Sequence, residues 1–342
     1  MAFAAAFLVS LVLAFALTPF ADRLAWATGF LDRPAARKLH TSATALLGGP
    51  VVFVCALGGW GAARLLAPAT FERDAITLLS GAFIALGLGL WDDRFGMQPA
   101  VKLLGQSAAI GTLLTSGEVP NFGIPPEIAG PVLIVLLVGL MNAANFLDNM
   151  NGMLAGLAGI ALLAFGVHSA SRGAYGTAAA QLALAGGCAG FLPWNFPRAR
   201  IFLGDAGSLF LGYSLGASAV LACHGPSTGW GRLGAGLVLG YPAFDIVFVV
   251  INRLREGRKV YTGGKDHTNH RLASVMQCPK RTVLLLWLLG AVLSASGLAV
   301  QSLNRPLPAL LMSVLWLGLF LMAGRRLSSV PIETSPPPPT KS

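Results

Sequence analysis

Charged residues are scarce in this chain, and their scarcity excludes most classes of soluble protein. Only 11% of its 342 residues are Asp, Glu, Lys or Arg, whereas 55% are hydrophobic. Apolar runs of about 17–25 residues, long enough to cross a bilayer, recur along nearly the whole sequence. No soluble basic domain is left over to hold nucleic acid, so we expect no nucleic-acid partner. The composition indicates an all-α polytopic membrane protein surrounded by membrane lipids.

We expect about eleven transmembrane helices (10–11) in a single membrane domain over residues 1–326. The remaining segment, 327–342, contains four consecutive prolines and is expected to be a disordered tail. The four cysteines are scattered, without the spacing of a disulfide framework or a metal site. The expected spans lie near residues 3–20, 46–66, 75–91, 99–116, 129–147, 152–170, 175–193, 206–223, 233–251, 282–301 and 307–324.

Acidic residues are outnumbered, and the excess of positive charge falls on one side of the membrane. The chain carries 24 Lys and Arg against 14 Asp and Glu, a formal net charge of +10. Most of the basic residues fall in alternate loops and in the tail, which the positive-inside rule places in the cytoplasm. The N-terminus is then outside and the C-terminus inside. These basic loops attract anionic lipid, and part of their charge is also suited to an anionic substrate.

The most informative charges are carboxylates at the ends of apolar runs. Asp92 and Asp93 follow one run, Asp148 ends another, Asp205 opens a third and Asp245 lies near the end of a fourth. A carboxylate at membrane depth costs roughly 2.5–3.5 kcal/mol on insertion scales, so a cluster of them needs a compensating interaction. A shared divalent cation together with phosphate chemistry would supply that interaction.

The stretch Gly204-Asp205-Ala206-Gly207-Ser208 opens an apolar span. Asp205 stands at a natural N-cap position, where free backbone N–H groups and the helix dipole favour phosphate. Its carboxylate is a candidate Mg²⁺ ligand, and the two glycines would let a ligand approach the backbone. An ordinary capped helix after a glycine turn is the alternative. Phe202, three residues earlier, is either a packing residue or a ring that stacks on a nucleotide base.

Polar residues also share one face at the end of the span near 129–147. On a helix, Asn142, Asn145 and Asp148 follow i, i+3, i+6, which indicates a polar cavity. Hydrogen bonding between helices is the alternative, and it suits Asn142 best. Lys102 lies inside another span, where its ammonium would neutralise the acidic cluster or clamp a phosphate, unless it snorkels to the interface.

A basic loop carries the stretch Lys265-Asp266-His267-Thr268-Asn269-His270-Arg271. Zinc needs about four ligands, and no Cys or further His lies nearby in sequence to complete such a site. Charge-assisted hydrogen bonds from His267, His270 and Arg271 suit a phosphate better. A solvated loop without a ligand is the alternative.

Four stretches carry a resemblance to a known family: Asp92-Asp93, the polar face that ends at Asp148, the stretch that opens at Gly204, and the basic stretch that ends at Arg271. In this order along the chain, they resemble the polyprenyl-phosphate N-acetylhexosamine-1-phosphate transferase superfamily over about residues 20–275. The resemblance implies transfer of a sugar 1-phosphate from a UDP-sugar to a polyprenyl phosphate such as undecaprenyl phosphate, with release of UMP. It also implies Mg²⁺ or Mn²⁺ as cofactor and an active site on the cytoplasmic face of the bacterial inner membrane. The histidine segment looks more like the N-acetylglucosamine-phosphate branch than the peptidoglycan branch.

The residues and the resemblance together assign a role to each stretch. The expected metal ligands are Asp205 and Asp148. The expected catalytic residues are Asp92, Asp93, Asp148 and Lys102. The expected substrate-binding residues are Asn145, Asn151, Asn195, Phe202, His267, His270 and Arg271.

The chain departs from the family pattern in three segments. Members usually read Asp-Gly-x-Asp-Gly where this chain has Asp148-Asn149-Met150-Asn151-Gly152. Asn151 therefore lacks a negative charge, which would alter donor preference or rate if the position contacts the nucleotide. Asn269 stands where a further histidine is common, and Ala45 where a proline is common.

Two other functions stay open at the level of sequence. Within the enzyme class, the alternative is a phospho-N-acetylmuramoyl-pentapeptide transferase of peptidoglycan synthesis. From another class, a cation-coupled transporter would also need membrane carboxylates, but it would place them near span centres. The sequence leaves open the donor sugar, the pathway and the choice between a one-step and a two-step reaction, and it is compatible with a homodimer.

Overall fold

A computed structural model describes the chain over residues 1–32, 43–68, 73–115, 117, 123, 125–224, 229–259 and 264–331. Helices dominate these residues, with one 3-10 turn, η2 (Gly229–Gly231), and two short strands, β1 (Leu31–Asp32) and β2 (Thr44–Ala45). The helices are α1 (Ala2–Thr28), α2 (Gly48–Leu66), α3 (Arg73–Phe95), α4 (Pro99–Thr115), α5 (Pro126–Leu147), α6 (Met153–Ser171), α7 (Tyr175–Asn195), α8 (Gly204–Ala222), α9 (Arg232–Val238), α10 (Gly240–Arg255), α11 (Thr268–Met276), α12 (Pro279–Leu303) and α13 (Pro306–Ser328).

The protein is a polytopic membrane protein built from helices. Within the described residues, seven helices are long and apolar enough to cross a bilayer, and the bent pair α9–α10 raises that number to eight. Helices α4, α7 and α8 fill the other stretches expected to span. Nearly every residue of α8 is buried inside the bundle, so its small residues serve helix packing and lower its hydropathy.

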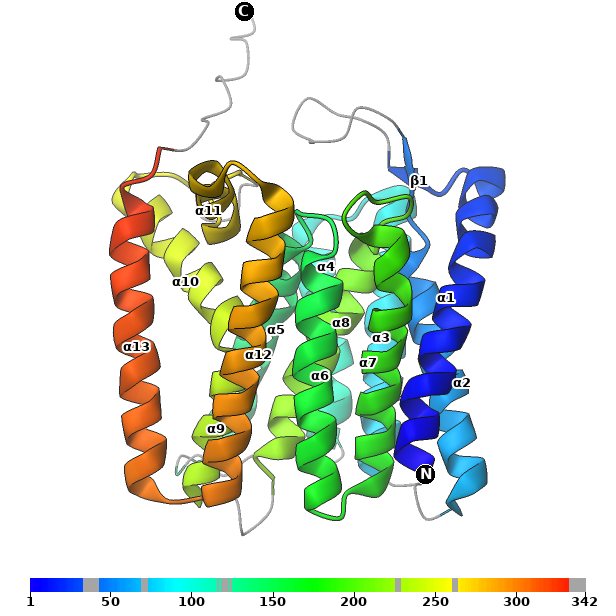
Figure 1. Cartoon of the computed structure of the whole chain (residues 1–342), viewed down its shortest axis with the longest axis horizontal. Helices are drawn as coiled ribbons and strands as arrows, with labels where there is room; N and C mark the ends of the chain where they lie inside the picture. Colours follow the sequence, from blue (N-terminus) through cyan, green and yellow to red (C-terminus); the bar gives the residue numbers. More distant parts are fainter. Residues whose placement is uncertain are drawn as a thin grey trace, which may run out of the picture.

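The bundle has two distinct ends (Figure 1). Met1 lies at one end, whereas α11, β1 and the last turn of α13 lie at the other. Helix α13 continues to Ser328, two residues beyond the expected end of the membrane domain. The proline-rich part of the expected tail, 332–342, lies outside the described residues.

The start of α8 is held directly against α3. Gly89 packs on the backbone of Asp205 and Ala206, where any side chain would clash. A glycine here lets the two helix backbones approach closely, as small residues do in membrane bundles. Asp92 and Asp93 follow Gly89 by about one turn, so α3 brings both carboxylates to the first turn of α8.

The span expected over 233–251 is not one straight helix. It is broken into α9 and α10, whose axes differ by 66°. Pro242 follows the break, and because it has no N–H it cannot donate to the carbonyl of Val238, four residues earlier. The bend carries the polar end of α10 toward α11 and α12.

A small sheet is the one departure from an all-helical chain among the described residues. Strand β1 pairs with β2 in antiparallel register, and Ala45 forms a parallel bridge with Ile201. The N–H of Phe202 donates to the carbonyl of Ala45 at 2.8 Å. The segment before α8 is thereby fastened to the segment before α2, which apolar periodicity could not predict.

Candidate active site

An acidic cluster forms where α3, α4, α5 and α8 meet. The Lys102 ammonium lies 2.8 Å from Asp92 Oδ2 and 2.6 Å from Asp205 Oδ2. Asn145 donates from Nδ2 to Asp205 Oδ1 at 2.7 Å and to the Ser208 hydroxyl at 2.8 Å. Lys102 therefore does not snorkel away but lies between two carboxylates. These contacts bring Asp92, Lys102, Asn145 and Asp205 together from segments far apart in sequence.

Asp93 occupies the N-terminus of α8. Its Oδ1 accepts the N–H of Asp205 at 2.9 Å, and its Oδ2 accepts the N–H of Ala206 at 3.0 Å. The expectation that these N–H groups stay free for phosphate is wrong, because a carboxylate from α3 already satisfies them. Gly204 has φ of 71°, and a Cβ there would lie 2.5 Å from Asp93 Oδ2, so this glycine makes room for Asp93.

Asp205 is also not the N-cap of its helix. Helix α8 begins one residue earlier, at Gly204, and Leu203 holds the cap position without a side-chain hydrogen bond. Because Asp93 takes over the capping role, the Asp205 carboxylate is free to face Lys102 and Asn145. That exchange of roles places Asp205 in the polar cluster.

The polar residues at the end of α5 differ in what they contact. Asn142 donates to Gln106 Oε1 at 3.1 Å, so this residue forms the hydrogen bond between helices that was its alternative role. Asp148 is close enough to Asp93 and Asp205 to be repelled by their charges. Among the contacts of the described residues, its carboxylate accepts no hydrogen bond and forms no ion pair. Asp148 thus has its full capacity to bind a ligand.

The cluster has more negative charge than its own lysine can balance. Within the described residues, Lys102 contacts the carboxyl groups of Asp92 and Asp205, and those of Asp93 and Asp148 lie close by. Within the described chain, no three His, Cys, Asp or Glu side chains form a ready-made metal cage. Mg²⁺, however, is usually bound through one or two carboxylates together with substrate phosphates. The oxygen-rich donor set and its excess charge therefore fit a magnesium ion that binds together with a diphosphate.

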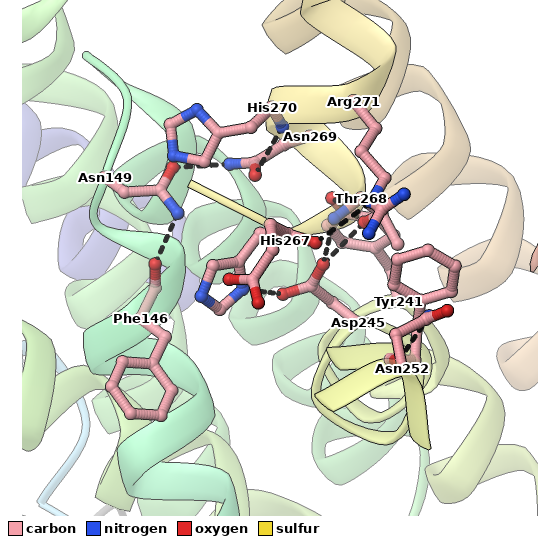
Figure 2. A network of polar contacts seen from close by, with 12 residues as sticks. Phe146, Asn149, Tyr241, Asp245, Asn252, His267, Thr268, Asn269, His270 and Arg271 are labelled. Carbon is pink, nitrogen blue, oxygen red and sulfur yellow. Dashed lines mark hydrogen bonds and ion pairs between the residues drawn. The ribbon is translucent and has the colours of Figure 1, made fainter. Parts of the chain in front are cut away.

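A second polar cluster lies across the end of α5, at the start of α11 (Figure 2). Asp245 of α10 contacts His267, and the His267 ring lies 5.6 Å from the ring of Phe146 on α5. Phe146 follows Asn145 directly, so the two clusters lie on either side of the same helix end. Burial and the neighbouring charge of His267 lower the pKa of His270 to about 4, which keeps that ring neutral near pH 7.

Two of the unusual asparagines contact each other. Asn269 donates from Nδ2 to Asn149 Oδ1, and Asn149 donates to the carbonyl of Phe146 at 2.6 Å. The Asn269 oxygen accepts the N–H of His270 at 2.8 Å. The series of hydrogen bonds fixes both amides and joins the loop after α5 to α11. The position of Asn269 was noted as a departure from the family pattern, but nothing in the sequence predicts Asn149 as its partner.

Arg271 is turned away from the acidic cluster. Its Nη1 donates to the carbonyls of Leu327, Ser328 and Val330 at 3.1, 3.1 and 2.8 Å, at the end of α13. The guanidinium also lies over the ring of Phe248, 5.3 Å from its centre. In this arrangement Arg271 satisfies carbonyls that the end of a helix leaves unpaired.

The loop before α11 is held by a buried ion pair that sequence reasoning missed. Arg253 donates two hydrogen bonds to Asp266, at 2.8 and 2.7 Å, and Arg258 lies 2.9 Å from the same carboxylate. Burial alone would raise the pKa of Asp266, but the bonds and charge of Arg253 outweigh burial and lower it to about 2. The fork of Arg253 thereby fixes the backbone that precedes His267.

The remaining predicted site residues lie in or next to the loops that flank the clusters, and they bond to backbone groups there. Asn195 is buried, and both ends of its amide are hydrogen-bonded: its oxygen accepts the N–H of Gly152 at 2.7 Å, and its nitrogen donates to the carbonyl of Ile201 at 2.9 Å. Asn151 donates to the carbonyl of Pro197 at 3.1 Å. Phe202 is half-buried two residues before the start of α8, and its carbonyl accepts the N–H of Gly48 at 3.0 Å.

Comparison with known proteins identifies the family. The profile described as "Glycosyl transferase family 4" matches residues 75–223. A protein of Bacillus subtilis (strain 168) named "Probable undecaprenyl-phosphate N-acetylglucosaminyl 1-phosphate transferase" is 31% identical over 327 residues, covering 93% of this chain and 87% of its own length. The chain belongs to glycosyl transferase family 4, the polyprenyl-phosphate N-acetylhexosamine-1-phosphate transferase superfamily.

Other relatives represent both enzyme branches considered above. A Thermotoga maritima protein named "Undecaprenyl-phosphate alpha-N-acetylglucosaminyl 1-phosphate transferase" is 32% identical over 260 residues, or 76% of this chain and 78% of its own. A Desulforudis audaxviator protein named "Phospho-N-acetylmuramoyl-pentapeptide-transferase" is 30% identical over 327 residues, covering 86% of this chain and 95% of its own. In this family 4 protein, the profile match spans α3 to α8 and therefore contains the acidic cluster.

Proposed function

We propose that this protein transfers N-acetylglucosamine 1-phosphate from UDP-N-acetylglucosamine to undecaprenyl phosphate and releases UMP. The observation that carries the proposal is the joint placement of Asp92, Lys102 and Asp205 beside an unpaired carboxylate, Asp148, at one end of a membrane bundle. The names of the Bacillus and Thermotoga relatives support this donor and this acceptor. The reaction would be the first membrane step of a cell-envelope polysaccharide.

We also propose an orientation for the bundle. Eleven crossings would place the N-terminus outside and the C-terminus in the cytoplasm of a bacterial inner membrane. The ends shown in Figure 1 agree with an odd number of crossings, since Met1 and the end of α13 lie at opposite ends. Helix α11 and the last turn of α13, with Arg325 and Arg326, lie at the same end of the bundle, so the positive-inside rule supports an active site that faces the cytoplasm.

In the proposed site, Asp205 and Asp148 would hold Mg²⁺ or Mn²⁺. When bound, such an ion supplies charge neutralisation for the diphosphate and for the departing UMP. Asn145 orients the Asp205 carboxylate through its 2.7 Å hydrogen bond. Lys102 is a point charge that can pass from its carboxylates to a substrate phosphate. Asp93 fixes the first turn of α8, so we assign it a positioning role.

The acceptor phosphate would attack the β-phosphorus of the donor. A new P–O bond forms to the lipid phosphate while the bond between the β-phosphorus and the oxygen shared with UMP breaks. A phosphate monoester has a second pKa of about 6, so near neutral pH most of the acceptor needs no base. Asp92 can accept the remaining proton. His267 and His270 would bind donor phosphate or sugar from the other side of α5, and Asn151, Asn195 and Phe202 would shape the nucleotide side.

The position of the polar groups favours an enzyme over a transporter. A cation-coupled transporter needs its carboxylates near the bilayer midplane. Here Asp92 and Asp93 lie in the last turn of α3, Asp148 follows α5, and Asp205 lies in the first turn of α8. All four carboxylates therefore belong to helix ends at one side of the bundle.

The test is product formation by the purified protein. We expect UMP and a lipid-linked sugar phosphate in equal amounts from undecaprenyl phosphate, UDP-N-acetylglucosamine and Mg²⁺, with loss of both products in EDTA. UDP-N-acetylmuramoyl-pentapeptide, supplied in parallel, separates the two enzyme branches. Product from that donor alone would reassign the protein to the branch of the Desulforudis relative. No product from any UDP-sugar with folded protein would contradict the transferase proposal.

A further inference from the structure

The Asp245 carboxylate is buried and completely engaged at the start of α11. Only 2% of its side chain is exposed, and its Oδ2 lies 2.7 Å from His267 Nδ1. Its Oδ1 accepts the N–H of Thr268 at 2.8 Å and the hydroxyl of Thr268 at 2.6 Å. An ionised carboxylate only accepts hydrogen bonds, so Nδ1 of His267 must carry the proton.

The neighbours of this carboxylate fix the direction of every hydrogen bond. Thr268 has a single hydroxyl proton, which it gives to Asp245. The Tyr241 hydroxyl, 3.1 Å from Thr268 Oγ1, must therefore be the donor in that pair. Tyr241 and Asp245 are four residues apart on α10, on one face of the helix. The bend at the start of α10 thus presents an ordered donor–acceptor series to α11.

Capping of a short helix does not by itself call for this arrangement. Threonine or serine can satisfy first-turn N–H groups without placing a full charge out of water. Among the described residues, His267 is the basic side chain that contacts Asp245, while Arg253 and Arg258 are bound to Asp266. Of the two histidines, His270 is kept neutral by its surroundings. The charge of Asp245 is therefore directed at one ring.

The other nitrogen of that ring is available to a ligand. Among the contacts of the described residues, none engages Nε2 of His267. Figure 2 shows the His267 ring between Asp245 and the end of α5, where Phe146 lies. The residue before Phe146 is Asn145, which holds Asp205 in the acidic cluster. A diphosphate bound at the acidic cluster would extend toward this ring.

We propose that Asp245 is a positioning residue that holds the His267 imidazolium with Nδ1–H on its carboxylate, so that Nε2–H donates to a phosphate of the nucleotide-sugar donor. This inference rests on the proposed function, because it assumes a diphosphate donor in the site. A carboxylate behind an imidazolium both fixes its orientation and stabilises its charge, and charge-assisted hydrogen bonds are roughly twice as strong as neutral ones.

The substitution Asp245→Asn tests the proposal with almost no change in shape. Thr268 still presents two donors, which keep the amide oxygen facing Thr268 and turn the amide NH₂ toward His267 Nδ1. The ring must then accept at Nδ1 and carry its proton on Nε2, and a doubly protonated ring has no acceptor left. We expect ¹⁵N NMR of histidine-labelled protein to show this loss of the Nδ1 proton, with the His267 signals assigned by their loss in His267→Asn.

The functional readout is donor binding without turnover. In the absence of lipid acceptor, we expect Asp245→Asn to weaken UDP-N-acetylglucosamine binding about tenfold, the difference between a charge-assisted and a neutral hydrogen bond. With acceptor present, KM should rise by a similar factor and kcat should change much less. Thr268→Val is the matched control, since it removes a partner of Asp245 but keeps the carboxylate on His267, and its donor affinity should stay near that of the wild type.

A double-mutant cycle excludes a purely structural effect. If Asp245 acts through His267, Asp245→Asn should weaken binding no further in a His267→Asn background. Unchanged donor affinity in Asp245→Asn, or equal losses in Asp245→Asn and Thr268→Val, would overturn the inference. Wild-type protein that binds the donor but forms no UMP would contradict the proposed function alone, whereas wild-type turnover with normal Asp245→Asn kinetics would contradict the inference alone.

Discussion

Lys102 and Asp205 form an ion pair with 2.6 Å between Nζ and Oδ2, inside the acidic cluster. The ammonium therefore lies on the carboxylate that we propose as a metal ligand. A lysine in this place competes with a divalent cation for Asp205, and it must move to a phosphate or another carboxylate when the cation binds.

The first prediction follows from this competition. Lys102→Met should raise the affinity of the site for Mg²⁺ or Mn²⁺ by about tenfold, because the ammonium that competes with the ion for Asp205 is removed. Turnover should nevertheless fall about 10²-fold or more, because a charge aimed at the transferring phosphate is gone. Mn²⁺ binding followed by electron paramagnetic resonance measures the first effect independently of activity. Weaker Mn²⁺ binding in Lys102→Met would show that the lysine does not compete with the ion.

A second prediction separates the two adjacent aspartates. Asp93→Asn should destabilise the protein by about 1–3 kcal/mol, because one N–H of α8 loses its acceptor and the helix terminus loses a negative charge. Asp92→Asn keeps an oxygen near Lys102 and leaves the first N–H groups of α8 on Asp93, so its melting temperature should change less while its activity falls. Thermal unfolding in detergent, compared with turnover of the same samples, measures both. Equal melting temperatures for the two variants would contradict the claim that Asp93 stabilises the start of α8.

The third prediction concerns the contact between Asn149 and Asn269. Asn149→Ala and Asn269→Ala should each weaken donor binding, since either one releases α11 from the loop after α5. The double variant should lose less than the sum of the two, with a coupling energy of about 0.5–1.5 kcal/mol. Donor titration of the four proteins measures that energy. Strict additivity would mean that the two asparagines act separately.

The fourth prediction is a dependence of stability on pH. The pKa of Asp266 in the folded protein is about 2, below the value of about 3.9 for a free aspartate. A lowered folded-state pKa adds stability at pH above about 4 and loses it as pH falls toward 2, by about 2 kcal/mol in total. Unfolding of the wild type and Asp266→Asn between pH 2 and 6 should show stabilities that converge at the acid end. A constant difference across that range would contradict the assignment.

The placement of helices could be predicted because apolar runs of sufficient length have few alternatives in a membrane. The break at Leu239 could not, because Pro242 lies inside one continuous stretch that is long enough to span the membrane and is interrupted by a single charge, Asp245. Nor could the sequence predict that Asp93 accepts the first N–H groups of α8. Its partners at α8 lie 112 and 113 residues further along the chain, and only the packing of Gly89 brings them together.

Sequence could predict which residues gather where polar residues share one helix face: Asn145 contacts Asp205, and Asp148 lies near the same carboxylate. The roles assigned to these residues stay predictions. The site was predicted least well where a side chain could serve either the ligand or the fold. Arg271 carries the charge expected of a phosphate-binding residue, yet it satisfies the carbonyls at the end of α13. Sequence records the chemistry of such a residue, whereas the direction of its side chain depends on the helix packed beside it.

The most direct test of the transferase account follows the β-phosphorus of the donor. Purified protein would be given UDP-N-acetylglucosamine labelled with ³²P at the β-phosphate, together with undecaprenyl phosphate and Mg²⁺, beside an Asp205→Ala control. The account predicts label in the lipid fraction, none in the nucleotide product UMP, and no transfer by Asp205→Ala. Label retained in a nucleotide released as UDP would show that the bare sugar moves, and near-normal transfer by Asp205→Ala would contradict the proposed metal site.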